Sequence, residues 1–303
     1  MKDYGLVSII TPNWNCGNYV SETIRSVQAQ TYHNWEMIIV DDCSTDDTYS
    51  VCESIKDDRI WVIKHKKNTR AGVARQTGLK YATGDFVTFL DSDDYLLPNF
   101  IEGMIALQKQ HDSDIVYTSF TISYEKEGVN KVIPAGDFIM SESATVQLYY
   151  WNEIKFLTGK LIRRSLCDTI PWSNRRVGED CQTLYFLLYN SKRVRSSSFT
   201  GYVHVFRPGS LLADKPFFYC FCWSTLAQID IIEFLKRKYY SMKPDDLNYK
   251  DTKRLLDFEL DGIIKGYESV KKGIASGQIS VGGEYKEWDR IQKWFNENKR
   301  LFI

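Results

Sequence analysis

Short apolar runs alternate with amphipathic helical stretches through the first part of the chain, and this alternation constrains the fold more than any other feature. Runs with strand composition occupy residues 6–11, 35–40, 60–64 and 86–90. A first helix is predicted after Asn18, a candidate N-cap, where apolar residues recur at helical spacing. Further helices are predicted over 45–55, 72–81 and 98–110, and Pro98 suits the first turn of the last one. Strands that alternate with helices predict a parallel sheet covered by helices on both faces. The sequence therefore predicts an α/β fold.

The rest of the chain divides into two further regions. Residues 111–215 have a mixed pattern of β-like and aromatic runs, and from Pro216 onward the pattern is helical and rich in aromatic residues. No internal repeat or low-complexity linker separates these regions, so we expect them to pack on the first region. The expected divisions are 1–110, 111–215 and a helical C-terminal extension over 216–303.

Charge and cysteine content exclude several classes of protein. Lys plus Arg and Asp plus Glu number 39 each, so no net field draws the chain to nucleic acid. The seven cysteines are scattered and form no CxxC pair, which is typical of reduced thiols in a cytosolic protein. The N-terminus has neither the apolar core nor the cleavage site of a signal peptide. We therefore expect a cytoplasmic protein without a nucleic-acid partner.

Polar clusters follow the first, second and fourth predicted strands. They read TPNWN, DDCSTDD and DSDD, and ligands bind at the carboxyl ends of strands in sheets of this kind. The close carboxylates of Asp91, Asp93 and Asp94 repel one another unless a cation neutralises them. In an extended segment Asp91 and Asp93 point to the same side, one toward a ribose and one toward Mg²⁺ or Mn²⁺. The alternative is a solvated acidic turn that caps the next helix.

Four segments together resemble a known family. They are VSIITPNWN, WEMIIVDDCSTDDT, NTRAGVARQTGL and GDFVTFLDSDDYLLP, and in this order and spacing they resemble the inverting family 2 glycosyltransferases of the GT-A fold. Gly178-Glu179-Asp180 resembles a later acidic motif of the family, and HVFRPGSL resembles its segment rich in Arg and Ser. The resemblance implies one GT-A domain with a mixed, mainly parallel sheet. Its donor-binding half is expected at 1–110, and its acceptor-side half, which carries the catalytic base, at 111–215.

The resemblance implies a nucleotide site built from the first three segments. Pro12 and Trp14 match residues that contact uracil, and an aromatic face suits a nucleobase, although Trp14 can instead simply close the sheet. Asp42 matches an acid that accepts a hydrogen bond from uracil, which favours a UDP-sugar, whereas Asp41 is expected to hold the loop or to cap the next helix. Arg75 matches an arginine near the diphosphate, and its alternative is an ordinary arginine on a helix surface.

The two acidic motifs take the remaining roles that the resemblance implies. Asp91 matches the ribose-side aspartate, and Asp93 matches the ligand of a divalent cation, Mn²⁺ or Mg²⁺, that neutralises the UDP leaving group. Thr11 and Ser92 belong to the same motifs and are assigned to the donor site with them. Asp180 matches the general base that deprotonates the acceptor hydroxyl, and its alternative is the N-cap of the helix expected over 183–189.

Residues downstream of these motifs complete the expected site. Asp94 is expected to support the DSDD loop. Arg207 and Ser210 are expected to close over the diphosphate, which places Arg207 in the donor site as well. His204 is either a metal ligand or a structural histidine.

The segment 216–240 combines many aromatic residues with a basic end. Phe217, Phe221, Trp223 and Ile231 can line an apolar surface that lies in the membrane interface, packs on the catalytic domain or joins a second subunit. Acidic residues within the segment argue against a membrane span. The resemblance implies a saccharide acceptor on a polyisoprenyl diphosphate, met at the inner face of a bacterial membrane during O-antigen or capsule polysaccharide biosynthesis.

The expected reaction moves a hexose or N-acetylhexosamine from a UDP-sugar to a hydroxyl of the saccharide acceptor, with inversion in one displacement. One alternative is a sugar-nucleotide nucleotidyltransferase, which carries a basic, Gly-rich loop after its first strand, whereas TPNWNCGNYV has no basic residue. The other alternative is a catalytically inactive sugar-nucleotide-binding or scaffold protein. The joint presence of Asp91, Asp93 and Asp180 speaks against it.

Overall fold

The computed structural model of the chain divides into two compact units. It describes residues 4–124, 128–141, 156–173, 175, 177–207, 217–246, 248–280, 285–298 and 300. The first unit comprises Met1–Asn174 and Thr183–Pro208, and the second comprises Arg175–Gln182 and Gly209–Ile303. The segment that carries Gly178, Glu179 and Asp180 therefore belongs to the second unit, together with the C-terminal helices.

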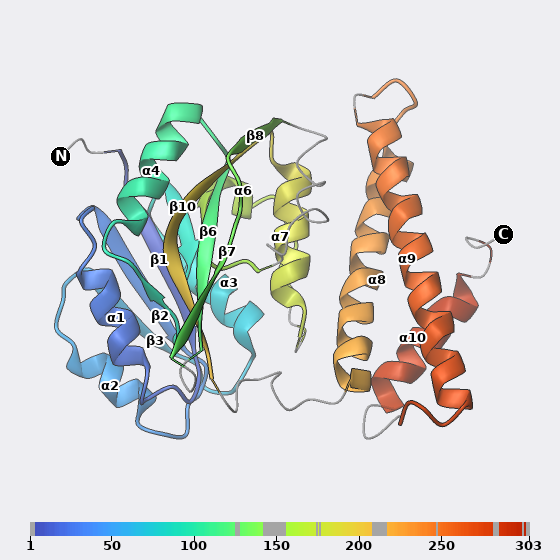
Figure 1. The fold of residues 1–303 in the computed structure, drawn as a ribbon, viewed down its shortest axis with the longest axis horizontal. Helices are drawn as coiled ribbons and strands as arrows, with labels where there is room; N and C mark the ends of the chain where they lie inside the picture. Colours follow the sequence, from blue (N-terminus) through green and yellow to red (C-terminus); the bar gives the residue numbers. More distant parts are fainter. Residues whose placement is uncertain are drawn as a thin grey trace. The chain divides into compact units, whose positions relative to one another are not determined.

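A large mixed sheet forms the centre of the first unit (Figure 1). Its strands are β1 (Val7–Asn13), β2 (Trp35–Asp41), β3 (Ile60–Lys64), β4 (Phe86–Phe89), β5 (Tyr95–Leu96), β6 (Ile115–Tyr124), β7 (Val129–Ile133), β8 (Phe138–Ser141), β9 (Lys160–Arg163) and β10 (Arg193–Phe206). The order is β3-β2-β1-β4-β9-β6-β10-β5, with β7 beside β6 and β8 beside β10. Strands β1 to β4 pair in parallel, and β6 pairs in parallel with β10. Strand β9 runs antiparallel to both β4 and β6, so strands β1 to β4 point in the same direction as β6 and β10. This confirms the predicted mainly parallel sheet.

Helices cover both faces of this sheet. They are α1 (Val20–Gln28), α2 (Thr48–Ser54), α3 (Ala71–Tyr81), α4 (Phe100–His111), α6 (Arg164–Cys167) and α7 (Glu179–Asn190), whose first turn falls in the second unit. Side chains of α1 and α4 share one core cluster with Ile9 and Met37. On the opposite face α3 packs so closely that a Cβ at Gly78 would lie 2.5 Å from Ile10. Because β1 is covered on both faces, all seven of its residues are buried.

Three helices begin later than the sequence predicts, among them α2, which starts at Thr48 and not at 45. Helix α1 starts at Val20 with Tyr19 as its N-cap, so the prediction that Asn18 caps it is wrong. Backbone amides of Tyr19 and Val20 donate to the carbonyl of Cys16, at 2.9 and 3.0 Å, and this turn satisfies them without a side-chain cap. Likewise Pro98 is not in the first turn of α4, which starts at Phe100.

The second unit contains three long helices, α8 (Phe217–Ser241), α9 (Tyr249–Ala275) and α10 (Tyr285–Glu297). They enclose an aromatic core in which Trp288 contacts Phe218, Phe221 and Tyr267, at ring-centroid distances of 5.6, 6.3 and 5.3 Å. Trp223 and Ile231 are also buried, whereas packing of the 216–240 segment on the catalytic domain stays a prediction. The side chain of Phe217 lies outside the described ones.

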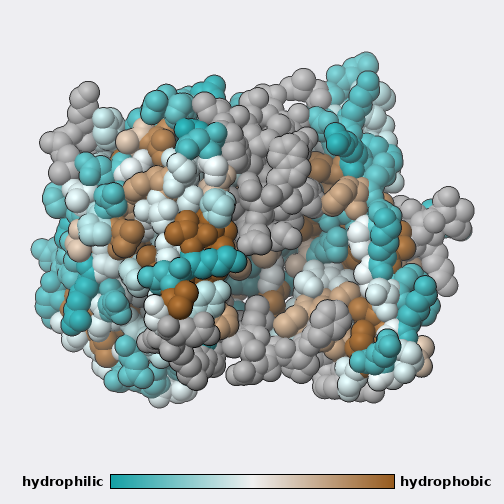
Figure 2. Space-filling view, in the orientation of Figure 1, coloured by the Kyte–Doolittle hydropathy of each residue, from teal (hydrophilic) through white to brown (hydrophobic). Residues whose placement is uncertain are grey.

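Helix α8 is nevertheless long and apolar. Within the described chain it alone has the length and composition to cross a bilayer, over Phe218–Ser241, and 67% of its most apolar window is buried in the protein. A core helix of a soluble protein passes the same test. Helix α9 exposes mainly charged side chains, seen as hydrophilic atoms in Figure 2.

Candidate functional site

Loops at the carboxyl ends of β1 and β2 are tied together. The backbone amide of Asn15 donates to the Ser44 hydroxyl at 3.0 Å, and the Asn15 side-chain oxygen accepts from the amide of Thr45 at 2.9 Å. Asn15 and Cys43 both have positive φ, 52° and 66°, a conformation that non-glycine residues adopt at a cost. Strained loop residues of this kind concentrate at functional sites.

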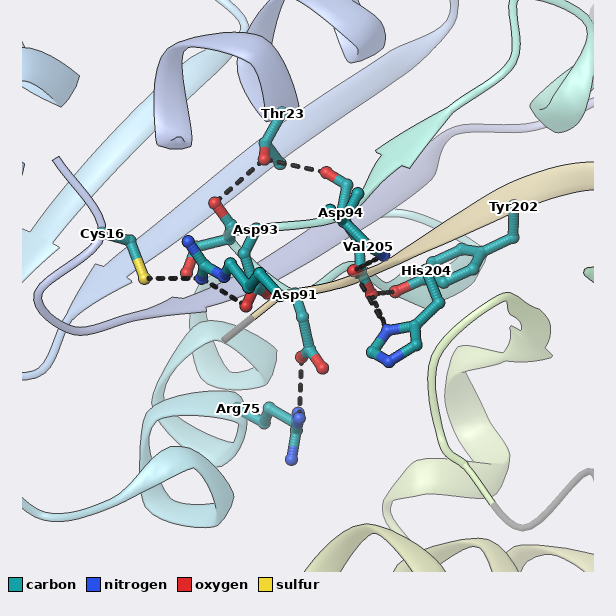
Figure 3. Close-up of polar contacts among 11 residues, drawn as sticks. Cys16, Thr23, Arg75, Asp91, Asp93, Asp94, Tyr202, His204 and Val205 are labelled. Atoms are coloured by element: carbon teal, nitrogen blue, oxygen red, sulfur yellow. Dashed lines mark hydrogen bonds and ion pairs between the residues drawn. The ribbon is translucent and has the colours of Figure 1, made fainter. Parts of the chain in front are cut away.

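The DSDD segment forms a turn at the end of β4. The amide of Asp94 donates to the carbonyl of Asp91 at 3.1 Å, so the prediction of an extended segment with Asp91 and Asp93 on one side is wrong. The turn directs the three carboxylates to three separate sets of partners (Figure 3). Repulsion among them is therefore reduced by local donors on each carboxylate.

Arg75 of α3 is the partner of Asp91. Its Nη2 lies 2.9 Å from Asp91 Oδ1, and the arginine is 4% exposed. The alternative of an ordinary surface arginine is therefore wrong for this position. The Asp91 side chain is 36% exposed, so this carboxylate is accessible to solvent while it pairs with the buried guanidinium of Arg75.

Arg207 is the partner of Asp93. Its guanidinium Nη2 lies 2.5 Å from Asp93 Oδ2 and its carbon lies 3.5 Å from the centre of the Tyr19 ring. Although burial opposes the charged form, the neighbouring carboxylate raises the pKa of Arg207 above its ordinary value. Tyr19 was not predicted as part of the site. It stacks on Arg207, which is distant in the sequence, and no local sequence pattern indicates such a contact.

Asp94 is buried and holds the end of β10. Its carboxylate accepts hydrogen bonds from the hydroxyl of Tyr202 and, at 2.9 Å, from the amide of Val205, and it lies 3.1 Å from His204 Nδ1. Burial raises the pKa of Asp94 to about 6. These contacts agree with the expected support role of Asp94, and they favour the structural alternative for His204.

His204 is expected to stabilise the fold in a pH-dependent way. Partial burial opposes its charge, but the hydrogen bond and charge of Asp94 raise its pKa above 6.5. A raised native pKa gives stability that is present below the unfolded value and is lost as pH rises through the native value. His204→Gln should therefore lower the free energy of unfolding by about 1 kcal/mol near pH 6.5, a figure reduced for solvent screening at this half-exposed side chain.

Urea denaturation of the wild type and of His204→Gln at about pH 6.5 and about pH 9 checks this expectation. The difference between the two proteins should shrink at the higher pH. An equal difference at both pH values would contradict the assignment of this stability to the charged imidazole.

Asp42 holds the loop that leads into α3. Its carboxylate is 3% exposed and accepts hydrogen bonds from the amide and hydroxyl of Thr69, at 2.8 and 2.7 Å, and from the amide of Arg70. His65 Nδ1 lies 2.7 Å away. The role of Asp42 toward uracil stays a prediction, whereas its role in the loop is visible. Asp41 also holds a loop, since its carboxylate accepts from the amide of Ser44 at 3.2 Å.

The other predicted donor-site residues differ in exposure. Thr11, Pro12 and Ser92 are buried, and the carbonyl of Ser92 accepts a hydrogen bond from the Thr23 hydroxyl at 3.0 Å. Trp14 is 49% exposed and does not close the sheet. Of these residues, Trp14 is therefore the one whose side chain is open to a ligand.

Asp180 lies in the first turn of α7, which begins at Glu179 and not at 183. Its side chain is half-buried, and its Oδ1 accepts a hydrogen bond from the amide of Cys181 at 2.7 Å. A carboxylate at this end of a helix is stabilised by the helix dipole. Ser210, predicted to close over the diphosphate, lies outside the described residues.

The chemistry of the cluster suits a cation that is shared with a phosphate ligand. In the described part of the chain, no three His, Cys, Asp or Glu side chains gather closely enough to hold a metal ion by themselves. Mg²⁺ usually keeps several waters and binds one or two carboxylates together with substrate phosphates, so one aspartate suffices. Asp93, with 26% of its side chain exposed, fits that requirement.

Comparisons with known proteins bear on this arrangement. A family model described as Glycosyl transferase family 2 matches residues 8–170, more than half of the chain. The sequence is 27% identical over 309 residues to Glycosyltransferase GlyG of Streptococcus pneumoniae serotype 4, covering 97% of this chain and 98% of that protein. It is 38% identical over 133 residues to UDP-Glc:alpha-D-GlcNAc-diphosphoundecaprenol beta-1,3-glucosyltransferase WfgD of Escherichia coli, covering 44% of this chain and 52% of that protein.

Among solved structures, S. aureus TarS 1-349 in complex with UDP-GlcNAc has a similar fold. The TM-score is 0.63 at 20% sequence identity, and the match covers 89% of this chain and 92% of that one. At this identity the likeness concerns the fold alone.

Proposed function

The chain belongs to glycosyl transferase family 2, with the predicted GT-A fold, and we propose that it moves a hexose or N-acetylhexosamine from a UDP-sugar to a saccharide hydroxyl with inversion. The name of the relative WfgD specifies UDP-Glc and a diphosphoundecaprenol-linked GlcNAc. We therefore infer a lipid-linked acceptor and a place in bacterial surface-polysaccharide assembly, at the cytoplasmic face of the membrane.

One observation supports this proposal above the others. At the carboxyl end of β4, Asp91 and Asp93 keep partly exposed carboxylates, and each is held by an arginine, Arg75 or Arg207. Carboxylates can bind a ribose hydroxyl or a divalent cation, and guanidinium groups bind diphosphate oxygens. Side chains of both kinds, brought together at one turn from distant parts of the chain, suit a sugar nucleotide.

We assign the roles of the donor site as follows. Trp14 offers an exposed face to the uracil ring, and Asp91 accepts a hydrogen bond from the ribose. Arg75 and Arg207 attract the diphosphate, and Asp93 would hold Mn²⁺ or Mg²⁺. When bound, such a cation supplies charge neutralisation to the departing diphosphate.

We assign proton transfer to Asp180. Its carboxylate would take the proton of the acceptor hydroxyl as that oxygen attacks the anomeric carbon. The new bond forms while the bond from the anomeric carbon to the diphosphate oxygen breaks, so the products are UDP and a glycoside of inverted configuration. No covalent bond between sugar and enzyme is needed.

A donor screen tests the proposed activity. The protein is incubated with Mn²⁺ or Mg²⁺ and a panel of nucleotide sugars, and UDP release is followed with and without an undecaprenyl-diphosphate-linked saccharide. We expect preference for one UDP-sugar, release that depends on the acceptor, and loss of release when EDTA removes the cation.

The screen also separates the alternatives. Formation of a nucleotide sugar from a nucleoside triphosphate and a sugar phosphate would identify a nucleotidyltransferase. UDP-sugar binding without release under every condition would identify an inactive binding protein. Turnover that persists fully in EDTA would contradict the assigned role of Asp93.

A further inference from the structure

The segment that carries Asp180 is fastened to helix α8 by one carboxylate. Asp230 of α8 accepts two hydrogen bonds from the guanidinium of Arg175, the bond from Nη2 being 2.6 Å long. It also accepts one from Gln182 Nε2 at 2.8 Å. Arg175 and Gln182 stand on either side of Asp180 in the sequence, so one residue of α8 holds both ends of this segment.

Backbone packing reinforces this attachment. Gly178 has a φ of +80°, and a Cβ added to it would lie 3.1 Å from the Cβ of Ala227. Ala227 and Asp230 are three residues apart on α8 and therefore share one face of the helix. The chain reaches the first turn of α7 along this face, at a point where only a glycine combines the required φ with the close approach.

The attachment is built for rigidity. The Arg175 side chain is 11% exposed. Its bidentate pairing with the Asp230 carboxylate fixes the relative orientation of the two groups as well as their distance. Gln182 is 3% exposed, so its amide has little access to solvent donors and acceptors. The Asp230 side chain retains 36% exposure, so part of its carboxylate still faces water.

We propose that Asp230 is a positioning residue, which holds the 175–182 segment on α8 and so fixes the direction of the Asp180 carboxylate. This inference rests on the proposed role of Asp180 as the base. It gives the C-terminal helices a part in the reaction itself. A displacement of a catalytic group by about 1 Å can slow a reaction about a hundredfold, so loss of this attachment has a measurable effect.

The test compares two alanine variants of the same helix. Asp230→Ala removes the attachment, whereas Gln228→Ala removes a 2.8 Å bond from Gln228 to Glu259 of α9 and serves as the matched control. We expect Asp230→Ala to lower kcat about 10- to 100-fold with the KM for the UDP-sugar unchanged, and Gln228→Ala to leave both values near those of the wild type. Asp230→Asn, which keeps the shape of the side chain, should lie between Asp230→Ala and the wild type.

Two further measurements distinguish positioning from general stability. Hydrogen exchange of the amides of residues 179–182 should be faster in Asp230→Ala than in Gln228→Ala. The charge-swapped pair Arg175→Asp with Asp230→Arg should recover part of the lost kcat.

The outcomes separate this inference from the proposed function. Equal kcat in Asp230→Ala and Gln228→Ala at a temperature at which both are folded, with equal exchange at 179–182, would overturn the positioning role. A wild type that turns over no nucleotide sugar would instead overturn the proposed function, and hydrogen exchange would then still decide whether Asp230 holds the segment.

Discussion

Asp180→Asn is expected to lower kcat by about 10²- to 10⁴-fold while UDP-sugar binding stays as in the wild type, because an amide cannot take the acceptor proton. The substitution keeps the size of the side chain, and the Asn oxygen can still accept the hydrogen bond from the Cys181 amide. Helix α7 should therefore start as before. Single-turnover transfer to the acceptor and calorimetric titration with UDP measure the two quantities.

Glu179→Gln is the matched control for this substitution, since Glu179 lies beside Asp180 in the same helical turn. It removes the same charge from the helix N-terminus, so any effect of the helix dipole is shared by both variants. The loss of kcat should be far smaller than in Asp180→Asn. A normal turnover of Asp180→Asn would show that another group accepts the proton.

Asp93→Ala is expected to abolish most metal-dependent binding of UDP and to lower kcat/KM about a hundredfold or more. Neutralisation of the leaving group by a bound cation supplies several kcal/mol, and each 1.36 kcal/mol is about tenfold in rate. In this variant Arg207 loses the Asp93 carboxylate that lies 2.5 Å from its guanidinium. The unpaired guanidinium then still places a positive charge near the diphosphate. Binding measured in EDTA should therefore change much less than binding measured with Mn²⁺.

Asp94→Asn separates metal binding from support of the loop. Asp94 is buried against Tyr202 and pairs with the half-exposed His204, so its amide variant should lower thermal stability and retain metal-dependent UDP binding. Calorimetry with and without Mn²⁺ compares the two variants directly. Equal dependence on Mn²⁺ in the wild type and Asp93→Ala would remove Asp93 from the cation site.

Much of the first unit could be predicted because its determinants are local. Strand β3 has the expected bounds, and β2 extends one residue past its expected end, since each is marked by a short run of mainly apolar residues. Helix starts were less predictable. At α1 the carbonyl of Cys16 satisfies the first amides, and the backbone of a preceding turn leaves no mark in side-chain composition.

The site was predictable in its residue types but not in its pairings. Asp91 and Asp93 stood out because close carboxylates are costly without neutralisation. Their arginine partners, by contrast, lie 16 and 114 residues away in the chain. Spacing within a motif carries no information about contacts over such separations.

A layered α/β sheet with acidic and polar loops at the ends of its parallel strands could be predicted from sequence patterns, because periodicity and strand-end chemistry act between near neighbours. The tertiary structure shows which charge neutralises which. It assigned Arg75 to Asp91, and it attached the segment of Asp180 to α8 through Asp230. Those contacts depend on how distant segments pack against one another, and packing is a property of the whole folded chain.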